Sequence, residues 1–593
     1  MSGELTEPTT QRLDYLPLIG QQLKRLRIAH IVDERCRVDP RSAVTTGQCV
    51  EALITAILMG SHTLYMVDEL LAPFDLELGL GFKASAVQFN DDRLAHALDE
   101  VFVGGPAEIS SAAIVGALAV YELSLKRLHF DTSSVKVFGE YAASRAPEDP
   151  EDPRAIPHVT FGYSKDRRPD LKQILLGVTV TGDGAVPICG RVASGNRMDA
   201  NENRFNIEQL AKIIPDLSQS TLIGDSKFFA GETLRLAAKY LLKFITMLPR
   251  TVGLWETAFA ALQAAKSVGP IPTLRENQGG PLGATLDSWK GQSFSFDYAW
   301  EDEEKKSHTF PVRLLVIEST SLRGQKRVTL ERHRATELAR LEKASRALSK
   351  KKTVFKSAEE AEKDAKERVG SPRFHKVEIA VSNESRPVKR AGRGRPRADE
   401  PQRLEHVFRA VLTIQDQPQA FNAQLDREST FVLATTLPSV GPGAQSDIEV
   451  FNSYREQHTV EGCHKWMKGP LAVAPVFLKS PSRIAALGTV YILALMTYAL
   501  VQREVRSRLA ATATQMPGNN KSWTSSPTTE VIFRLFAGVF TTRQPGGDVT
   551  VNNMNTEQVR LLELLKNDVL HRPGVTVATP RTPTRGQRGY RAP

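Results

Sequence analysis

Cysteine is scarce in this sequence of 593 residues. Its four cysteines are Cys36, Cys49, Cys189 and Cys463, and none of them forms a CxxC pair. This scarcity excludes a disulfide-rich framework, and the missing CxxC spacing excludes a zinc knuckle. Because proteins of a reducing compartment keep their cysteines unpaired, we expect this protein in the cytoplasm.

Long apolar runs are also few. The N-terminal stretch, MSGELTEPTTQRLDYL, lacks the basic start and the apolar core of a secretory signal. One run, residues 484–501, approaches the roughly 20 apolar residues that can span a bilayer. Gly488, Thr489, Thr497 and two tyrosines interrupt this run, which favours a buried core helix. We therefore expect no membrane among the partners of the protein.

Neither sign of charge dominates strongly. The 77 Lys and Arg residues outnumber the 67 Asp and Glu residues, which gives a formal net charge of +10 and a pI near 9.3. This balance favours an anionic partner without demanding one. Hydrophobic residues make up 41% of the chain and charged residues 24%, which is typical of globular chains with a large core. At this length we expect several domains.

Changes in residue pattern divide the chain into five segments. Residues 1–122 contain helix-period apolar stretches, which predict a helical N-terminal domain. Strand-like and helical stretches follow one another in residues 123–249, which predicts a mixed α/β sheet. The remaining segments are an insertion at 250–449 with strand-like pieces and one long charged helix from about 328 to 368, a return to the α/β core at 450–510, and a C-terminal region at 511–593 with a disordered basic tail. A solvated helical hairpin is the alternative for the charged stretch.

The first candidate carboxylate stands in the middle of a predicted strand, LHFDTSS. Asp131 alternates there with Phe130 and Thr132, so its side chain points to the opposite face of the strand. Strand interiors disfavour aspartate, and a carboxylate on a covered face is costly unless it is paired or binds a metal. The alternative is a strand-end aspartate that makes a local turn.

A second candidate, Asp225, follows the short apolar strand in STLIGDSKFF. Functional side chains gather at the carboxyl ends of buried strands, so this position suits a catalytic acid. An N-cap for a helix near residues 228–234 explains the same aspartate equally well.

The third candidate lies in the polar stretch SYREQHTVEGCHKWMKGP. Ser453 opens a capping-box pattern and a Gly-Pro pair ends the stretch, so we expect one helix between them. On that helix one polar sector, about 60° wide, contains Tyr454, Gln457, Glu461 and Lys468. An ordinary amphipathic surface helix is the alternative.

Three acids from distant segments suit a site for divalent metal ions. Two ions about 4 Å apart can activate the attacking oxygen and stabilise the leaving oxygen in a displacement at phosphorus. Mg²⁺ prefers carboxylate oxygens, and we expect Mn²⁺ to substitute for it. Without cations between them, carboxylates this close repel one another. We therefore predict that Asp131, Asp225 and Glu461 bind two Mg²⁺ ions and form a catalytic set.

These segments resemble the DDE transposases of bacterial insertion sequences, in the group with a Tyr-x2-Arg-x3-Glu-x6-Lys signature after a β-rich insertion. Tyr454, Glu461 and Lys468 match the signature, whereas Gln457 stands where the family usually has Arg. HFDTSSVKVFGEY, GYSKDRRPDLKQ, ASGNRMDANEN and LIGDSKFF are also similar to family segments, so the resemblance covers roughly residues 20–510. It assigns transposon-end phosphates to Tyr454, Gln457 and Lys468, and Gln457 lacks the charge of an arginine in that role.

The resemblance implies a ribonuclease-H-like catalytic core over residues 123–249 and 450–510, interrupted by the insertion. It implies hydrolysis at transposon ends to expose a 3′-OH, followed by attack of that hydroxyl on target DNA. The implied partners are the terminal inverted repeats, the target DNA and a second copy of the chain in a synaptic homodimer. Residues 1–122 become a candidate for binding DNA ends, although a scaffold role is equally open. A nuclease without strand transfer and an inactive DNA-binding descendant remain alternatives.

Two basic stretches are further candidates for contact with DNA. Lys165 and Arg168 stand in a loop that either lines a DNA path or is simply solvated. Arg393 and Arg395, in KRAGRGRPRADEP, resemble the core of a minor-groove AT-hook. A flexible basic linker is the alternative for this second stretch.

Overall fold

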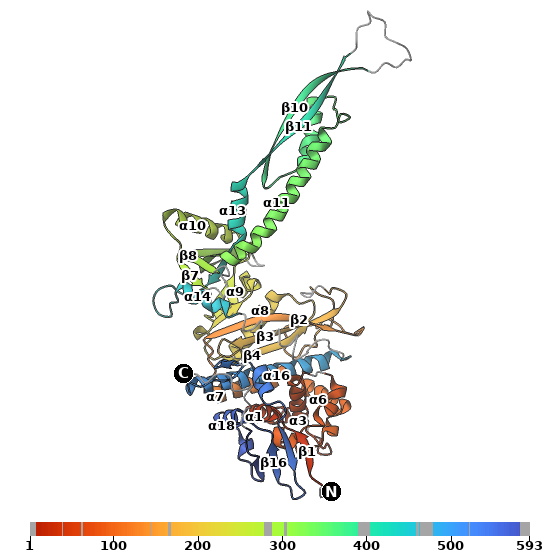
Figure 1. Ribbon diagram of the computed structural model, residues 1–593, viewed down its shortest axis with the longest axis vertical. Helices are drawn as coiled ribbons and strands as arrows, with labels where there is room; N and C mark the ends of the chain where they lie inside the picture. The colour runs from red at the N-terminus through yellow and green to blue at the C-terminus, as the bar shows by residue number, and fades with distance from the viewer. Residues whose placement is uncertain are drawn as a thin grey trace, which may run out of the picture.

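The computed structural model describes residues 7–37, 39–60, 63–142, 144–163, 168–277, 287–301, 305–388, 404–457, 462, 478–520 and 522–581. Within these residues the largest sheet has nine strands in the order β4-β3-β2-β5-β6-β12-β9-β8-β7. Helices pack around this sheet, so the fold is mixed α/β, as the sequence predicted (Figure 1). Its strands are β2 (Arg127–Val137), β3 (Lys172–Thr181), β4 (Pro187–Ser194), β5 (Thr221–Gly224), β6 (Lys243–Met247), β7 (Thr273–Glu276), β8 (Ser288–Glu301), β9 (Ser307–Ser319) and β12 (Thr430–Thr435).

Strands β2 to β6 form one half of this sheet. β2 pairs antiparallel with β3 and parallel with β5, β3 pairs antiparallel with β4, and β5 pairs parallel with β6. β3 and β5 are buried along almost their whole length because helices cover both faces of the sheet. On one face Asn206 of α8 (Asp199–Ile213) hydrogen-bonds Thr179, and on the other Ile492 of α16 (Pro481–Ala511) packs over Gly190. Helix α9 (Gly231–Lys239) connects β5 to β6.

Strands from the predicted insertion extend the same sheet. β12 lies between β6 and β9 and is antiparallel to both, and β8 and β7 continue the sheet to its edge. In β9 the residues from Val312 to Ile317 are all buried, which fits a strand covered on both faces. Helix α10 (Leu254–Val268) packs against β8 and β9. Residues 250–449 therefore contribute strands to the central sheet rather than forming only a separate unit.

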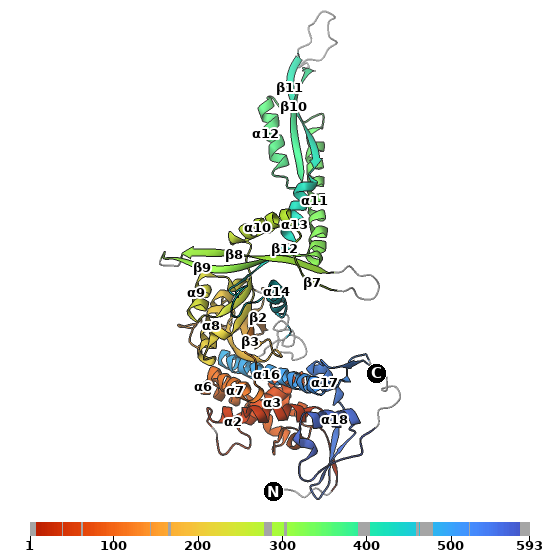
Figure 2. The same cartoon turned by 90° about the vertical axis from the view of Figure 1, so that its left-hand side faces the viewer.

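A long arm leaves this end of the sheet (Figures 1 and 2). We define the arm as residues 320–388 and 404–416. It consists of α11 (Thr320–Leu348), α12 (Ala358–Val369), β10 (His375–Pro387) and β11 (Leu404–Asp416), and α13 (Pro418–Glu428) leads the chain back to the sheet. β10 and β11 form an antiparallel pair of their own.

The charged stretch expected from about 328 to 368 is two helices rather than one, which agrees with the alternative of a helical hairpin. α11 ends at Leu348, and Ser357 caps α12 by accepting a hydrogen bond from the Glu360 amide at 3.1 Å. The break lets both helices bury apolar residues in one small core. That core consists of Leu341, Ala344, Leu348, Ala361, Ala365, Val369, Ala410 and Leu412.

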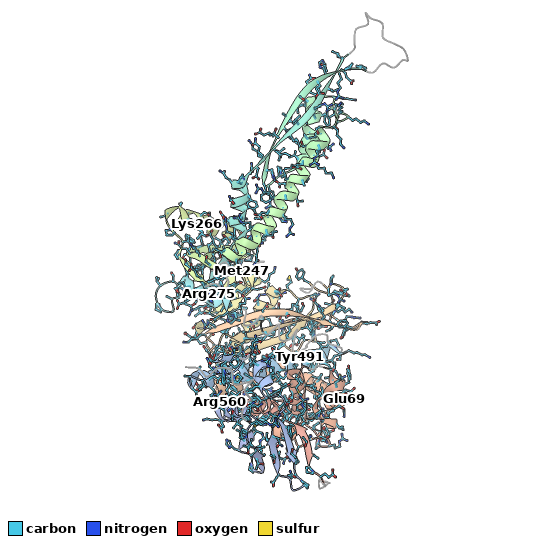
Figure 3. The ribbon with its side chains drawn as sticks, viewed as in Figure 1. Glu69, Met247, Lys266, Arg275, Tyr491 and Arg560 are labelled. Atoms are coloured by element: carbon cyan, nitrogen blue, oxygen red, sulfur yellow. The ribbon has the colours of Figure 1, made fainter. Side chains whose placement is uncertain are left out.

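Helix α16 contains the apolar run at 484–501. It is long and apolar enough to cross a membrane, with a mean hydropathy of 2.1, but 94% of that window is buried inside the protein. The helix lies between the sheet and the N-terminal helices, where it contacts β4, α3 and α6 (Figure 2). The prediction of a buried core helix is therefore confirmed. Figure 3 labels Tyr491, one of the side chains that α16 buries.

The two ends of the chain fold together. β1 (Thr9–Arg12) pairs with β15 (Phe540–Arg543) in a four-stranded sheet with β16 (Val549–Asn552) and β17 (Val575–Val577). The helices of this unit are α1 (Leu16–Leu26), α2 (Ile28–Asp33), α3 (Thr46–Leu58), α4 (Val67–Leu71), α5 (Leu76–Leu80), α6 (Asp91–Gly104), α7 (Pro106–Tyr121), α17 (Thr529–Leu535) and α18 (Thr556–Leu564). The tail expected to be disordered lies largely outside the described residues, which end at Arg581.

Candidate active site

Asp131 lies in the middle of β2, half-buried, with buried residues on either side of it. Its neighbour Thr132 points to the opposite face and donates a 2.7 Å hydrogen bond to Asp199 at the start of α8. Asp131 Oδ1 accepts a hydrogen bond from the Thr132 amide at 2.8 Å. Asp131 therefore belongs to the face of the sheet away from α8, which is the face that α16 covers.

Asp225 follows the last residue of β5 and is also half-buried. Its Oδ1 accepts a 3.0 Å hydrogen bond from the Lys227 amide and so caps the short 3-10 turn Ser226–Phe228. The carbonyl oxygen of Asp225 accepts a hydrogen bond from Thr246 on β6. Capping thus involves this turn rather than α9, and it leaves the backbone of Asp225 extended and anchored to the neighbouring strand.

The strand register brings the two aspartates together. In the parallel pair β2–β5, Arg127 stands beside Thr221 and His129 beside Ile223. Two residues further along each strand are Asp131 and Asp225. Because side chains alternate along a strand, both acids lie on the same face as His129 and Ile223. Adjacent strands are about 4.8 Å apart, so this register gives Asp131 and Asp225 equivalent positions on β2 and just beyond β5.

Helix α14 (Asp447–Arg455) lies on that same face. Its buried Val450 and Phe451 pack in one cluster with Ile223 of β5 and Ile245 of β6, and Tyr454 packs against this cluster. Tyr454, expected to contact DNA phosphates, is therefore a half-buried residue above the strand that ends at Asp225.

One helix was expected from Ser453 to the Gly-Pro pair, but Ser453 lies inside α14, which begins at Asp447 and ends at Arg455. Most of the expected helix lies outside the described residues. Ser446 forms the capping box with Glu449, upstream of the capping box that the sequence indicated at Ser453. The reason is burial, because only this earlier start places Val450 and Phe451 on the sheet. Gln457 ends the described stretch, and its amide donates to the Tyr454 carbonyl at 3.0 Å.

The residues that flank the interval 458–477 contact β2 and the loop that follows it. Before it, Glu456 forms a 3.4 Å ion pair with Arg127, the first residue of β2. After it, the carbonyl oxygen of Leu478 accepts a hydrogen bond from Tyr141, four residues beyond the end of β2. These contacts could not be predicted from the sequence, because nothing local marks Arg127 or Tyr141.

Several predicted site residues lie outside the described residues. They are Glu461, Lys468, Lys165, Arg393 and Arg395. Arg168 is described, and it forms a two-pronged ion pair with Asp170, with N···O distances of 2.8 and 2.6 Å. This hydrogen-bonded guanidinium lowers the pKa of Asp170 to about 2. The positive charge of Arg168 is therefore shared with a neighbouring carboxylate.

Two arginines, one at the end of α14 and one that contacts it, were not anticipated as site residues. Arg455 lies over the ring of Trp289 at 4.5 Å, and burial lowers its pKa below the ordinary arginine value. Arg275 lies close to α14 and donates to the Asn452 side chain at 3.4 Å (Figure 3). The end of α14 that leads to the signature residues thus carries positive charge next to an aromatic surface.

An aromatic stack lies close to the loop that follows Asp225. Phe229 from that loop contacts Tyr298 at 4.8 Å between ring centroids, and Tyr298 stacks on Trp300 at 5.5 Å. Trp300 in turn stacks on His308 at 5.1 Å. The β8–β9 hairpin is therefore fixed against the loop that positions Asp225.

The carboxylates suit a hard divalent cation. Asp131 and Asp225 supply oxygen ligands on one face of adjacent strands, which is the donor type that Mg²⁺ prefers. Within the described ranges, no group of three or more His, Cys, Asp or Glu side chains stands close enough to hold a metal ion. The described residues thus provide two of the three predicted ligands.

Comparison with known proteins gives limited information. Residues 8–115 match a family described as a domain of unknown function, DUF4277. No curated protein matches the sequence. A solved structure, that of the piggyBac transposase synaptic complex with hairpin DNA, aligns at 13% identity and a TM-score of 0.23 over 51% of this chain. This chain spans 62% of the length of that one. A TM-score of this size identifies neither a shared fold nor a shared activity.

Proposed function

We propose that this protein is a DNA transposase of the DDE type, in which β2 to β6 and their helices form a ribonuclease-H-like core. The observation that supports this most is the register of β2 and β5, whose last parallel pair, His129 and Ile223, stands two residues before Asp131 and Asp225. A local turn or a helix cap explains either acid alone, but neither explains why the two hold equivalent positions on adjacent parallel strands.

Glu461 is the third acid of the proposed catalytic set. It is four residues along the chain from Gln457, which corresponds to at most about 14 Å of extended chain. The preceding residue, Glu456, is ion-paired to Arg127, and Asp131 is four residues further along β2, about 13 Å away. The chain from Gln457 to Glu461 is therefore long enough to bring the Glu461 carboxylate to the two aspartates.

The proposed reaction is hydrolysis of a phosphodiester at the transposon end, followed by attack of the freed 3′-OH on target DNA. Asp131, Asp225 and Glu461 would hold two Mg²⁺ ions, which supply Lewis-acid stabilisation at phosphorus when bound. The three carboxylates would hold and orient the metal ions, and they would not themselves attack the phosphorus. Mn²⁺ with the same oxygen ligands is expected to support the reaction.

Residues on and after α14 are proposed to position the DNA. Tyr454 packs on the cluster that contains Ile223 of β5, and Gln457 and Lys468 follow it in the same signature. Arg275 and Arg455 add positive charge beside this helix, where phosphate oxygens would be attracted. The proposed partners are the terminal repeats, the target DNA and a second copy of this chain in a synaptic complex.

The direct test is cleavage of a duplex carrying the DNA ends that flank the coding region, with Mg²⁺ present. Asp131→Ala, Asp225→Ala and Glu461→Ala should each lower the cleavage rate by roughly 10³-fold, because metal binding contributes several kcal/mol. DNA binding, measured by fluorescence anisotropy, should persist in all three variants. Asp297→Ala is a matched control, because Asp297 is an exposed carboxylate on β8 of the same sheet.

Each outcome separates the candidate functions. If an alanine variant cleaves DNA at the wild-type rate, the substituted residue is not catalytic. Wild-type protein that binds DNA but does not cut it indicates a non-catalytic DNA-binding protein. Cutting without joining indicates a nuclease rather than a transposase.

A further inference from the structure

Most of the net positive charge of the chain lies on its arm. Residues 320–388 and 404–416 contain 19 Lys and Arg residues against 12 Asp and Glu residues, so they contribute +7 of the total of +10. These charges are far from the two aspartates along the structure. α11 alone has 29 residues, which corresponds to about 43 Å of helix, and it begins at the end of β9. The catalytic chemistry proposed above does not need charge at the far end of this helix.

The arm has an exposed lysine turn between α11 and α12. We define the lysine turn as Lys350, Lys351 and Lys352, whose side chains are all exposed. The Thr353 amide closes it by donating to the Lys350 carbonyl at 2.9 Å. Thr353 Oγ1 also donates to the Ala347 carbonyl at 2.9 Å, which ties the turn to the last turn of α11.

Two arginines from the β10–β11 pair hold this turn by its backbone. Arg409 donates to the carbonyl oxygens of Lys350 and Lys351 at 3.2 and 3.1 Å, and Arg386 donates to that of Lys351 at 3.1 Å. The backbone carbonyls therefore face the hairpin. With the carbonyls held there, the turn has a fixed place on the arm, from which the lysine side chains extend into solvent.

The acids nearby are already occupied. Glu384 accepts from Arg409 at 2.8 Å and lies 3.8 Å from Arg386, so it neutralises the arginines that hold the turn. Glu360 accepts a hydrogen bond from the Lys356 amide. None of the three lysines forms an ion pair with any residue that the structure describes. Three consecutive positive charges without an ion pair among the described residues thus stand on a fixed turn, whereas Lys366 and Lys376 elsewhere on the arm are paired with glutamates.

We propose that the lysine turn binds the phosphate backbone of duplex DNA, at a distance from the catalytic centre. This inference rests on the proposed function only for the choice of DNA as the anionic partner. Closely spaced point charges on a fixed turn complement the regular phosphates of a duplex and read no base sequence. The turn therefore adds affinity without adding sequence preference.

The test is the salt dependence of DNA binding by the full-length protein. Each lysine that neutralises one phosphate contributes about 0.9 to the slope of log K against log salt concentration. Lys350→Ala, Lys351→Ala and Lys352→Ala combined should lower that slope by roughly 2 to 3 and weaken binding at least about tenfold. The probe is a duplex of random sequence of about 40 base pairs, measured by fluorescence anisotropy in EDTA.

The control removes three paired cations from the same arm, by Lys366→Ala, Arg368→Ala and Lys376→Ala. It changes the net charge by the same amount, and each removed side chain is ion-paired to Glu362, Asp364 or Glu378. The control should keep a slope close to wild type. A second variant with Lys350, Lys351 and Lys352 all changed to Arg retains charge and should restore the slope, which separates charge loss from misfolding.

Two results would overturn the inference: an unchanged slope in the triple alanine variant, which makes the turn merely solvated, or an equal loss in the control variant, which makes the effect one of net charge alone. Failure of the proposed function is seen separately. The wild-type protein could fail to cut DNA while the triple alanine variant still shows a smaller salt-dependence slope. That pair of results supports the DNA contact of the lysine turn and contradicts the transposase activity.

Discussion

At the scale of single residues, burial determines how Glu51 of α3 titrates. Its side chain is 8% exposed and accepts a hydrogen bond from the Ala29 amide at 3.0 Å. Burial raises the pKa of Glu51 to about 7 from an ordinary value of 4.5, against the opposing effect of the Ala29 hydrogen bond. The folded state therefore holds this proton more tightly than the unfolded state does.

The sign of the pH effect follows from this difference. The contribution of Glu51 to stability is fully present below about pH 4.5 and is lost as the pH rises through about 7. Glu51→Gln keeps the acceptor for Ala29 and removes the titration. We expect this variant to be more stable than wild type at pH 8, by an amount on the order of 3 kcal/mol, and to differ little at pH 5. Thermal unfolding midpoints at the two pH values measure it.

The control for Glu51 is Glu69→Gln, because Glu69 is an exposed carboxylate of α4 in the same helical unit (Figure 3). This control should match wild type at both pH values. If Glu51→Gln shows the same pH dependence as wild type, Glu51 is ionised in the fold at neutral pH and the argument from burial is incorrect.

The described cysteines should be unreactive in the folded protein. Burial raises the pKa of Cys36 to about 11 and the pKa values of Cys49 and Cys189 to about 12. Because the thiolate is the nucleophile, almost none of it is present at pH 7.5. A thiol reagent counted by mass spectrometry should modify at most one cysteine of the native protein, Cys463, and all four after denaturation. Rapid modification of two or more native thiols would show that these sites open or ionise.

At the scale of elements, close helix contacts require glycine at particular positions. A Cβ on Gly47 of α3 would lie 2.2 Å from the carbonyl oxygen of Ala29 and 2.6 Å from its Cα. A Cβ on Gly116 of α7 would meet only the Leu26 carbonyl, at 3.9 Å. Both glycines lie in helices of the N-terminal unit, so they form a matched pair.

Gly47→Ala should destabilise the protein by about 1–3 kcal/mol, because the backbone of α2 must move away from α3. Gly116→Ala should be neutral or stabilise by up to about 1 kcal/mol, because alanine favours the helix more than glycine does. Denaturant unfolding of the two variants compares them directly. Equal effects in the two would contradict the close approach of α2 and α3.

Elements were predicted best where burial leaves a local pattern. The continuous apolar runs of β3 and β5 gave their positions correctly, since a strand covered on both faces has no polar side. The start of α14 was missed because two capping patterns, at Ser446 and Ser453, follow one another closely. Only the contacts of Val450 and Phe451 with the sheet distinguish them, and such contacts are not local.

At the scale of the whole molecule, the long-range pairings were the part that no local pattern indicates. β1 pairs with β15 across more than 500 residues, and strands of the insertion extend the sheet that contains Asp131. The two aspartates stand out in the sequence because a carboxylate in or just after a buried strand is costly unless it is paired or binds a cation, and their catalytic role stays a prediction. The arginines that lie in or contact the α14 region, Arg127, Arg275 and Arg455, could not be singled out, since arginines occur throughout the chain.

The arrangement of the whole sheet determines the position of the proposed site. β2 and β5 are in the middle of the body, α16 and α14 cover the face that carries the acids, and the arm extends from the far side of the sheet (Figures 1 and 2). The proposed function requires that DNA strands are joined at Asp131 and Asp225.

Strand transfer from a pre-cut end tests that claim most directly. A duplex that already ends in the expected 3′-OH is incubated with supercoiled plasmid, Mg²⁺ and wild-type protein, Asp131→Ala, Asp225→Ala or the Asp297→Ala control. If Asp131 and Asp225 are catalytic, joined products form with wild type and the control, and none form with either aspartate variant. Joined products from an aspartate variant, or none from wild type that binds the DNA, would contradict it.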